Sequence, residues 1–361
     1  MFDPKFEITP NLLKYVSRVE AAKAVIENAP LLPLYERKFK AEATVRKVHF
    51  STAIEGNYLN LAEVQKVLSN PSYANDGIIS SSDESGAQVL ARQRDLNEVI
   101  NYRNVIMYIE SATKSSRKIN LSSSHLETLH QLLLKNIMDD VAGKYRTKTA
   151  MTVNFATGEK LYPYEEFGNI EVKMRELINW YNNESTNKLV HPVIKAGILH
   201  LELVRIHPFE EGNGRLARAI ATLSLSVDGY DVGHFFCLDE YYDSNAKDYY
   251  DNLSAGFNDL NVWLEYFATG MAVEFDRIKD RVLKISKDAK VKERSGQMFI
   301  TERQEKIIEW LNNFGYFRNQ DFDELFVDIS EDTVLRELKG LIDAKIIKKV
   351  GKTKSARYEL E

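Results

Sequence analysis

The sequence predicts a mainly α-helical protein with two or three domains. Apolar residues recur every three or four positions over most of the chain, which is the spacing of amphipathic helices. The 361 residues suffice for two or three domains at roughly 100–200 residues each. With 44% hydrophobic and 28% charged residues, the composition is that of a globular protein and excludes a disordered or collagen-like chain.

The net charge limits which binding partners the protein can have, and the cysteine content indicates its cellular compartment. The 48 basic and 53 acidic residues leave a net charge of −5, so the chain as a whole is not drawn to nucleic acid or anionic lipid. Its one cysteine, Cys237, excludes an internal disulfide and fits a reducing compartment. The sequence has neither a signal-peptide pattern nor a run of about 18 apolar residues. We therefore expect a cytoplasmic protein without membrane contact.

Helices are predicted over most of the first two thirds of the chain. Proline residues end the first helix, and a stretch rich in Ser, Asn, Asp and Gly at 69–86 is predicted to be a loop. Short β-favouring runs around a glycine-containing turn at 148–163 predict a hairpin. The expected helices cover residues 11–29, 34–54, 87–109, 170–180, 192–206 and 270–292.

The last part of the chain has a pattern of its own. Three helical stretches are followed by two β-like runs, at 302–313, 319–326, 331–344, 346–350 and 356–360. Ser330 is the predicted N-cap of the third helix. Three helices followed by a hairpin is the order of a winged helix. The expected domains are therefore a helical N-terminal domain, a central core and a winged-helix domain, at 1–115, 116–292 and 293–361.

One segment, from Ile206 to Arg218, carries a pattern that suggests chemistry. Pro208 disfavours helical geometry at His207, which predicts an imidazole at a helix end, facing out of the packed body. The following Gly212-Asn213-Gly214 can adopt backbone angles that other residues avoid. Amide N–H groups can then converge at the start of the next helix, where phosphates bind.

Charged residues flank this glycine turn. Arg215 and Arg218 are three apart, so they are expected on one face of the helix, beside the same anion. Glu211 precedes the turn and is placed to hold a divalent cation, as Mg²⁺–triphosphate sites require. A general base next to a phosphate cradle, a metal ligand and two arginines indicates phosphoryl or nucleotidyl transfer.

The segment resembles the signature HPFx[D/E]GNGRxxR of the Fic (Fido) family at every constrained position. This resemblance implies a helical Fic-like core with a β-hairpin flap that transfers AMP from ATP to a Ser, Thr or Tyr hydroxyl of a protein. It implies Mg²⁺ as cofactor. Modification of the protein by itself and formation of a homodimer are further expectations. By this resemblance His207 is the base and Glu211 is the Mg²⁺ ligand. The turn from Gly212 to Gly214, with Asn213, forms the anion hole, and Arg215 and Arg218 bind the β- and γ-phosphates.

Two further segments are similar to family elements. Gly143-Lys144-Tyr145-Arg146 is similar to the element ahead of the family's flap, which would cover about 153–163 and pair with the target by strand addition. Tyr249 and Tyr250 resemble a tyrosine pair that packs near the adenine, with ordinary core or surface packing as the alternative. The flap-tip residues that would contact nucleotide are Thr157, Gly158, Glu159 and Lys160.

An upstream segment, Ser51 to Gly56, matches the family's inhibitory motif [S/T]xxxE[G/N]. Ser51 and Glu55 are four apart, hence on one helix face, and Gly56 is a plausible C-cap. The resemblance implies that Glu55 pairs with Arg218 and withdraws it from the γ-phosphate, so that ATP binds unproductively. In some relatives this glutamate also activates water to remove AMP from the target, so a de-AMPylating enzyme that uses Glu55 is an alternative.

The predicted winged helix raises a second alternative, a DNA-binding regulator. Residues 301–361 hold 13 acidic and 11 basic residues, so this part has a net charge of −2, whereas DNA binding needs a basic surface. Only the hairpin region is basic, which makes DNA a less favoured partner than a protein. Among the remaining candidates, His200 is expected in the core, His191 at a helix start and Cys237 buried and inert.

Overall fold

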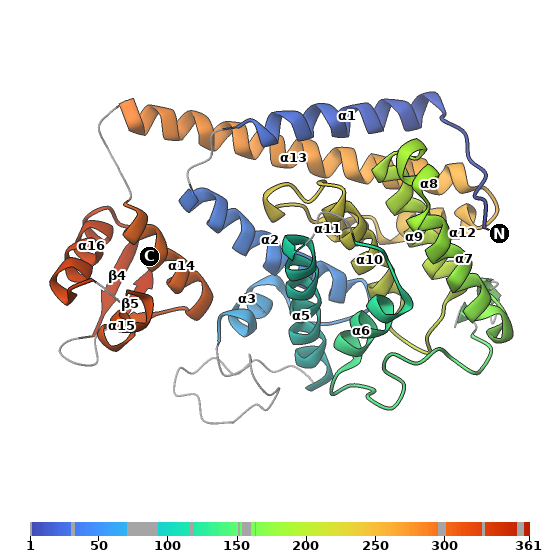
Figure 1. Ribbon diagram of the computed structural model, residues 1–361, viewed down its shortest axis with the longest axis horizontal. Helices are drawn as coiled ribbons and strands as arrows, with labels where there is room; N and C mark the ends of the chain where they lie inside the picture. Colours follow the sequence, from blue (N-terminus) through green and yellow to red (C-terminus); the bar gives the residue numbers. More distant parts are fainter. Residues whose placement is uncertain are drawn as a thin grey trace.

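A computed structural model describes residues 2–29, 33–70, 93–115, 119–150, 152–153, 160–162, 164–294, 301–326, 329–351 and 357–361. These residues form a mainly α-helical structure, as predicted (Figure 1). In chain order the helices of the main body are α1 (Pro10–Glu27), α2 (Pro33–Ala53), α3 (Leu61–Ser69), α5 (Gln93–Ser115), α6 (Ser123–Leu134), η1 (Phe167–Asn169), α7 (Ile170–Asn182), α8 (Glu184–Leu189), α9 (Pro192–Ile206), α10 (Asn213–Val227), η2 (Val232–His234), α11 (Leu238–Ser244), α12 (Ala246–Gly256) and α13 (Leu260–Arg294).

The helix α9 is central because it contributes to both hydrophobic cores of the main body. Leu199, Leu203 and Ile206 pack into one core with α5, α6, α7 and α10. Val193 and Ile198 pack into the other with α1, α12 and α13. A helix that is apolar on all sides is stable only when other elements surround it. The C-terminal end of α9, where the predicted motif begins, is therefore held by packing.

The long helix α13 begins ten residues before the sequence suggested, at Leu260 instead of Gly270. Gly270 lies in the interior of this helix. A larger residue would not fit there, because a Cβ at this position would collide with the ring of Tyr241. The helix α5 likewise extends beyond its predicted end to Ser115, and the part of the prediction at 87–92 falls outside the described residues. The predicted loop at 69–86 is described only as far as residue 70.

The helices α1 and α13 lie side by side and run in the same direction (Figure 1). Asn11 Nδ2 donates to Glu265 Oε2 at 3.2 Å, and farther along Arg18 Nη2 is 2.5 Å from Asp276 Oδ2. The first helix of the chain is thus fixed to one of the last elements of the main body.

The predicted hairpin is present as two short antiparallel strands, β1 (Thr152–Val153) and β2 (Lys160–Tyr162). Thr152 pairs with Tyr162, and Val153 pairs with Lys160. The turn between the strands lies outside the described residues.

The C-terminal unit, residues 301–361, has the predicted order of helices and hairpin and an additional strand (Figure 1). Its antiparallel sheet has the strand order β3-β5-β4, and its own core includes Phe317, Leu338 and Tyr358. Ser330 precedes the third helix, but its hydroxyl contacts Thr333 Oγ1 at 2.9 Å rather than the backbone. The elements are α14 (Glu302–Phe314), β3 (Phe317–Arg318), η3 (Asn319–Asp321), α15 (Phe322–Leu325), α16 (Glu331–Asp343), β4 (Ile347–Val350) and β5 (Arg357–Leu360).

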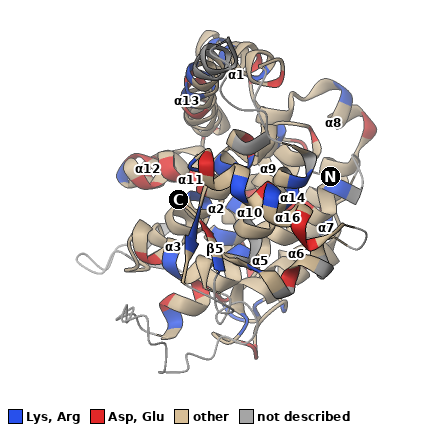
Figure 2. Ribbon diagram, turned by 90° about the vertical axis from the view of Figure 1, so that its left-hand side faces the viewer, with Lys and Arg blue, Asp and Glu red and all other residues tan. Residues whose placement is uncertain are grey.

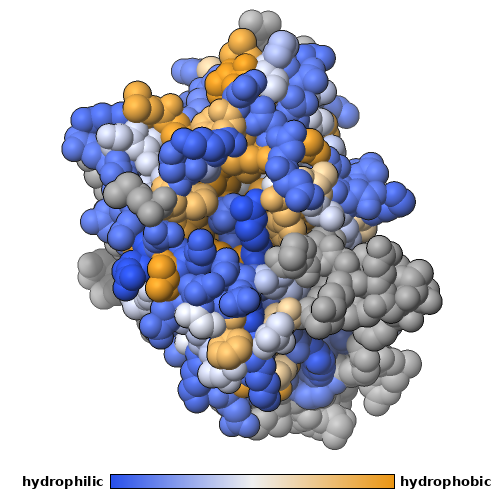
Figure 3. Space-filling view, turned by 90° about the vertical axis from the view of Figure 1, so that its right-hand side faces the viewer, coloured by the Kyte–Doolittle hydropathy of each residue, from blue (hydrophilic) through white to orange (hydrophobic). Residues whose placement is uncertain are grey.

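Charged residues of both signs are distributed along the described part of the chain (Figure 2). Figure 2 shows acidic and basic residues interspersed over the ribbon, in line with the small net charge of −5. Phe167, Val172 and Leu189 are exposed on η1, α7 and α8. These elements lie toward the side seen in Figure 3, where apolar surface is bordered by hydrophilic side chains. Within the described ranges, no helix has the length and apolarity needed to cross a membrane.

Candidate active site

The predicted motif forms a tight loop between the end of α9 and the start of α10. His207, the C-cap of α9, has a left-handed backbone conformation with φ 50°. Gly212, the N-cap of α10, is also left-handed, with φ 79°, which glycine adopts without strain. These two turns reverse the chain, so the loop lies at the N-terminus of α10. Four backbone N–H groups of such a helix start lack partners within the helix.

One buried arginine holds the first half of this loop. Arg146 donates through Nε to the carbonyl of His207 at 2.6 Å and through Nη2 to that of Ile206 at 3.3 Å. The same side chain donates through Nη1 to the backbone carbonyl of Lys148 at 2.7 Å and through Nη2 to the backbone carbonyl of Glu165. A planar guanidinium suits this task because its five N–H donors are fixed in direction. Sequence analysis had located Arg146 only as part of a family element.

We expect Arg146→Ala to lower the free energy of unfolding by about 3 kcal/mol, because it leaves several buried carbonyls without a donor. Arg146→Lys should lose less, since it keeps one donor group but not the fork. Urea denaturation measures both changes. Arg175→Ala, at an exposed position of α7, is the matched control and should change stability little. An equally small effect at Arg146 would contradict its role as a loop clamp.

A buried histidine holds the second half of the loop. The Gly143 N–H donates to His130 Nδ1 at 2.8 Å, so His130 Nε2 carries the proton and donates to the carbonyl of Glu211 at 2.8 Å. The His130 ring also stacks on Phe209, with centroids 3.8 Å apart. Burial lowers the pKa of His130 to about 4, so this pattern is stable at neutral pH. The histidine has no metal-ligand spacing, and its structural role could not be inferred from sequence.

The side chain of Asn213 does not face the predicted anion hole. Its Oδ1 accepts from the N–H of Phe209 at 3.0 Å, and its Nδ2 donates to the carbonyl of Phe209 at 2.8 Å. Asn213 thus closes the loop onto itself. Any contribution of this residue to an anion hole would come from its backbone N–H.

His207, the predicted general base, is half-buried rather than facing out of the body. Its ring stacks on Tyr164 with centroids 3.9 Å apart. Burial lowers the pKa of His207 to about 4, although the Val204 carbonyl and the charge of Glu55 oppose this shift. The imidazole is therefore neutral at pH 7, which is the form that accepts a proton.

The structure brings the predicted inhibitory residues together with Arg218. The buried guanidinium donates through Nη2 to Glu55 Oε1 at 3.0 Å and to the Ser51 carbonyl at 2.8 Å. Its Nε donates to Ser51 Oγ at 3.1 Å and lies 3.1 Å from Asp239 Oδ1. Burial raises the pKa of Asp239, and Arg218 opposes that effect. Asp239, on α11, was not predicted, since no local motif marks it.

Glu55 lies in the turn just after α2, and Gly56 with φ 88° lets the chain turn there, as predicted. Its carboxylate rests on the first turn of α10, where a Cβ at Gly214 would collide with Glu55 Oε1. Burial alone would raise the pKa of Glu55, but Arg218, Arg215 and His207 outweigh it and hold that pKa below its usual value. A negative charge thus occupies the helix N-terminus predicted for phosphate.

Arg215 has different partners from Arg218. Its Nη1 lies 3.3 Å from Glu98 Oε1, and its Nη2 lies 3.6 Å from Glu211 Oε1. Arg94 contacts the same two carboxylates, with Nε 3.2 Å from Glu98 Oε1 and Nη2 on Glu211 Oε1. We call these four residues the arginine–glutamate ring. The two phosphate-binding arginines predicted from the motif are therefore both paired with carboxylates.

Glu211 is the predicted metal ligand, and its chemistry fits that role. Mg²⁺ in nucleotide sites takes one or two protein carboxylates, and substrate phosphates and waters supply the other oxygens. Within the described ranges, no group of three or more His, Cys, Asp or Glu residues could hold a metal alone. A Mg²⁺ ion bound at Glu211 would thus depend on the nucleotide.

The remaining predicted site residues fall into two groups. Tyr249 is buried, with its ring 4.5 Å from that of Tyr242 and its Oη 3.3 Å from His200 Nε2. Burial raises the pKa of its hydroxyl, and Arg218 opposes that effect. Tyr250 is partly exposed, and its Oη donates to the Ile54 carbonyl at 3.4 Å, beside the inhibitory turn. Thr157, Gly158 and Glu159 lie outside the described residues, and Lys160 is described only as part of β2.

The structure agrees with the predictions for three residues outside the motif, His200, His191 and Cys237. His200 is fully buried and stacks on Trp263 with centroids 4.9 Å apart. His191 is the N-cap of α9 and accepts from the Val193 N–H at 3.3 Å. Cys237 is buried, and burial raises the pKa of its thiol well above the usual value.

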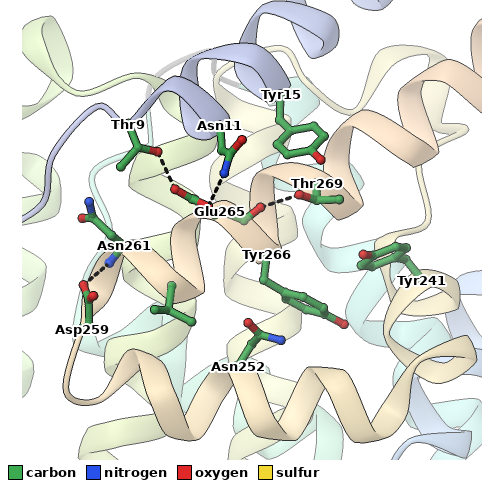
Figure 4. Close-up of a pocket in the computed structure, with 11 residues that line it drawn as sticks. Thr9, Asn11, Tyr15, Tyr241, Asn252, Asp259, Asn261, Glu265, Tyr266 and Thr269 are labelled. Atoms are coloured by element: carbon green, nitrogen blue, oxygen red, sulfur yellow. Dashed lines mark hydrogen bonds between the residues drawn. The ribbon is translucent and has the colours of Figure 1, made fainter.

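A separate cavity of about 500 Å³ lies across α13, between α1 and α12 (Figure 4). Its lining includes Tyr15, Tyr241, Asn252, Glu265 and Tyr266. Glu265 is hydrogen-bonded to Thr9 and Asn11 of the N-terminal part of the chain (Figure 4). Glu55, His207 and Arg218 lie elsewhere, at the junction of α2, α9 and α10.

Comparison with known families identifies the centre of the chain. Residues 120–225 match the model of the Fic/DOC family. This range contains the loop around His207 and both arginines of the motif. The chain carries a Fic domain. The matched range covers α6 to most of α10, whereas Ser51, Glu55 and the C-terminal unit lie outside it.

Curated relatives of the Fic domain are protein adenylyltransferases. The chain is 27% identical over 195 residues to protein adenylyltransferase fic-1 of Caenorhabditis elegans, which covers 54% of this chain and 34% of that protein. It is 30% identical over 194 residues to protein adenylyltransferase Fic of Drosophila grimshawi, covering 54% and 35%. The chain thus spans about a third of the length of these relatives.

Solved structures share the fold of this chain. A Fic family protein from Desulfovibrio desulfuricans G20 has a TM-score of 0.61 at 20% identity, covering 100% of this chain and 98% of that one. Residues 134–508 of Fic-1 from C. elegans give a TM-score of 0.59 at 22% identity, covering 77% and 73%. The first similarity includes the C-terminal unit as well as the Fic domain.

Proposed function

We propose that this protein is an adenylyltransferase that moves AMP from ATP to a Ser, Thr or Tyr hydroxyl of a protein target. The observation that carries the proposal is the imidazole of His207 in the loop before the N-terminus of α10, close enough to Glu55 to affect the pKa of that carboxyl, while Glu55 pairs with the buried Arg218. The N-terminus and the arginines suit the phosphates of a nucleotide, and the imidazole suits removal of a hydroxyl proton. The naming of the curated relatives as protein adenylyltransferases supports the same reaction.

In the proposed reaction, His207 takes the proton of the target hydroxyl as its oxygen attacks the α-phosphorus of ATP. A new bond forms between this oxygen and the phosphorus, and the bond from the phosphorus to the bridging oxygen breaks. AMP stays on the target and pyrophosphate leaves. Arg215 and Arg218 would bind the β- and γ-phosphates once they are released from their carboxylates. Mg²⁺, held by Glu211 and the nucleotide, would neutralise phosphate charge.

Glu55 is proposed to hold the protein in an inhibited state. Its carboxylate occupies the first turn of α10 and pairs with Arg218 at 3.0 Å, where a γ-phosphate is expected. The lowered pKa of Glu55 keeps it charged and makes it a weak base. We therefore favour AMP transfer with inhibition by Glu55 over AMP removal with Glu55 as the base.

The reaction class can be tested with labelled nucleotide. The Glu55→Gly variant is incubated with Mg²⁺ and ATP that carries the label on either the α- or the γ-phosphorus, in the presence of cell lysate. Label should remain on protein from the α-position only, and mass spectrometry should locate AMP on a hydroxyl side chain. Transfer of the γ-label would indicate a kinase reaction and contradict the proposal.

The pH dependence of His207 provides an independent prediction. Because burial lowers its pKa to about 4, its ring should stay neutral between pH 8 and 5.5. An ordinary histidine, with a pKa near 6.5, would be about 90% protonated at pH 5.5. Nuclear magnetic resonance of the ring ¹³Cε1 signals, assigned with His207→Asn, measures this directly. Titration of His207 near pH 6.5 would contradict the structural interpretation.

A further inference from the structure

The arginine–glutamate ring is a closed alternation of charges at the predicted metal ligand. Arg94 and Arg215 each contact both Glu98 and Glu211, so every charge in the ring has two opposite neighbours. Exposure divides the ring: Glu98 and Arg215 side chains are 5% and 2% exposed, whereas those of Glu211 and Arg94 are 31% and 50% exposed. One half is thus part of the core, and the other half faces solvent.

The buried half of the ring is fixed by the chain around it. Asn57 Nδ2 donates to Glu98 Oε2 at 2.9 Å and to the carbonyl of Asp95 at 3.0 Å. Its Oδ1 accepts from the N–H of Leu59 at 3.1 Å, just after the inhibitory turn. Glu98 therefore cannot follow a change at the solvent side without breaking buried hydrogen bonds. The contact between Arg94 and Glu211 has no such constraint.

We propose that Arg94 and a divalent cation compete for the carboxylate of Glu211. In the absence of a cation, Arg94 neutralises Glu211. When a cation binds with the nucleotide, Arg94 leaves Glu211 and remains bound to Glu98 through Nε. This inference rests on the proposed function, since it takes Glu211 as the cation ligand.

The geometry keeps the free-energy cost of releasing Arg94 from Glu211 small. Arg94 makes two separate contacts, with Nη2 on Glu211 and Nε on Glu98, so it can lose the first and keep the second. Its half-exposed side chain lets water solvate the released Nη2. Arg215 also lies near Glu211, at 3.6 Å from Oε1, but its side chain is only 2% exposed, so water could not solvate it after release. We therefore assign the exchange with the cation to Arg94, whereas Arg215 would leave its carboxylates only for a phosphate.

The proposal predicts that removing Arg94 strengthens cation binding. We would measure the Kd of Mn²⁺, from the electron paramagnetic resonance of free Mn²⁺, in the presence of a non-hydrolysable ATP analogue and in the Glu55→Gly background. Adding Arg94→Gln should lower the Kd about fivefold, the scale of one partly exposed charge pair. Arg94→Lys should change it less, and raising the salt concentration should reduce the difference.

Two further variants separate the possible results. Lys114→Gln removes an exposed positive charge at the other end of α5 and should leave the Kd unchanged. Glu211→Gln should abolish Mn²⁺ binding. If Glu211→Gln does so while Arg94→Gln leaves the Kd equal or higher, competition by Arg94 is wrong and the proposed function stands. If the Glu55→Gly protein binds neither the ATP analogue nor Mn²⁺, the proposed function fails and the inference fails with it.

Discussion

Replacing Glu55 with glycine should raise AMP transfer roughly ten- to a hundredfold. Glu55 holds Arg218 by a charge-assisted hydrogen bond of 3.0 Å. On the proposed function, ATP must break that bond before its γ-phosphate can take the place of the carboxylate. Such a bond contributes about 1.5–3 kcal/mol, which corresponds to this range of rates. Arg218 stays in position without Glu55, because Ser51 and Asp239 still contact its guanidinium. The measurement is the initial rate of α-label incorporation.

Two controls make the Glu55 result specific. Glu55→Gln keeps the size of the side chain and removes the charge, so it should activate almost as strongly as glycine. Glu36→Gln removes a carboxylate from an exposed position of α2 and should have no effect. The free energy of unfolding of Glu55→Gly should fall by no more than about the same 1.5–3 kcal/mol, because Ser51 and Asp239 still contact the Arg218 guanidinium. Equal rates for wild type and Glu55→Gly would refute inhibition by this residue.

Replacing His207 in the activated background should reduce AMP transfer about 10²- to 10⁴-fold, the usual contribution of a general base. His207→Ala removes the imidazole. His207→Asn is the better-matched variant, because asparagine tolerates the left-handed backbone that this position requires, with φ 50°. Both variants should retain nucleotide binding, since the neutral imidazole contributes no charge to the phosphate site.

The outcome for His207 depends on comparing rate and binding in the same protein. Loss of activity with ATP affinity preserved would identify a group that acts in the chemical step. His125→Ala, on α6 away from the loop, should keep full activity. Retained transfer in His207→Asn would exclude His207 as the base, and loss of both activity and folding would be visible by denaturation.

The arrangement of the site was predictable where it is encoded in adjacent residues. His207, Glu211 and Gly212 lie within six residues of one another, so the sequence alone places an imidazole, a carboxylate and a helix start in one loop. The helix periodicities were equally local and gave α1, α2, α7 and α9 to within a few residues. The Glu55–Arg218 contact, 163 residues apart, was predicted only through resemblance to a family motif.

The residues that the sequence did not reveal act on distant partners. Arg146 and His130 bind backbone carbonyls of the loop, 60 or more residues away, and any sequence offers carbonyls at every position. Asp239 and Arg94 are ordinary surface-type residues until the fold places them against Arg218 and Glu211. The motif shows that Asn213 is present but not which way its side-chain amide turns, so its two hydrogen bonds to the Phe209 backbone could not be predicted.

The separation between Glu55 and Arg218 has a consequence for how the protein is made. A ribosome adds residues from the N-terminus, so Ser51 and Glu55 exist before Arg218 and Asp239 have been joined to the chain. Arg218 is therefore buried in the presence of the Glu55 carboxylate that pairs with it. On the proposed function, each newly synthesised protein would therefore be inhibited as soon as it has folded. The cell would need a signal to activate the enzyme, but none to inhibit it after synthesis.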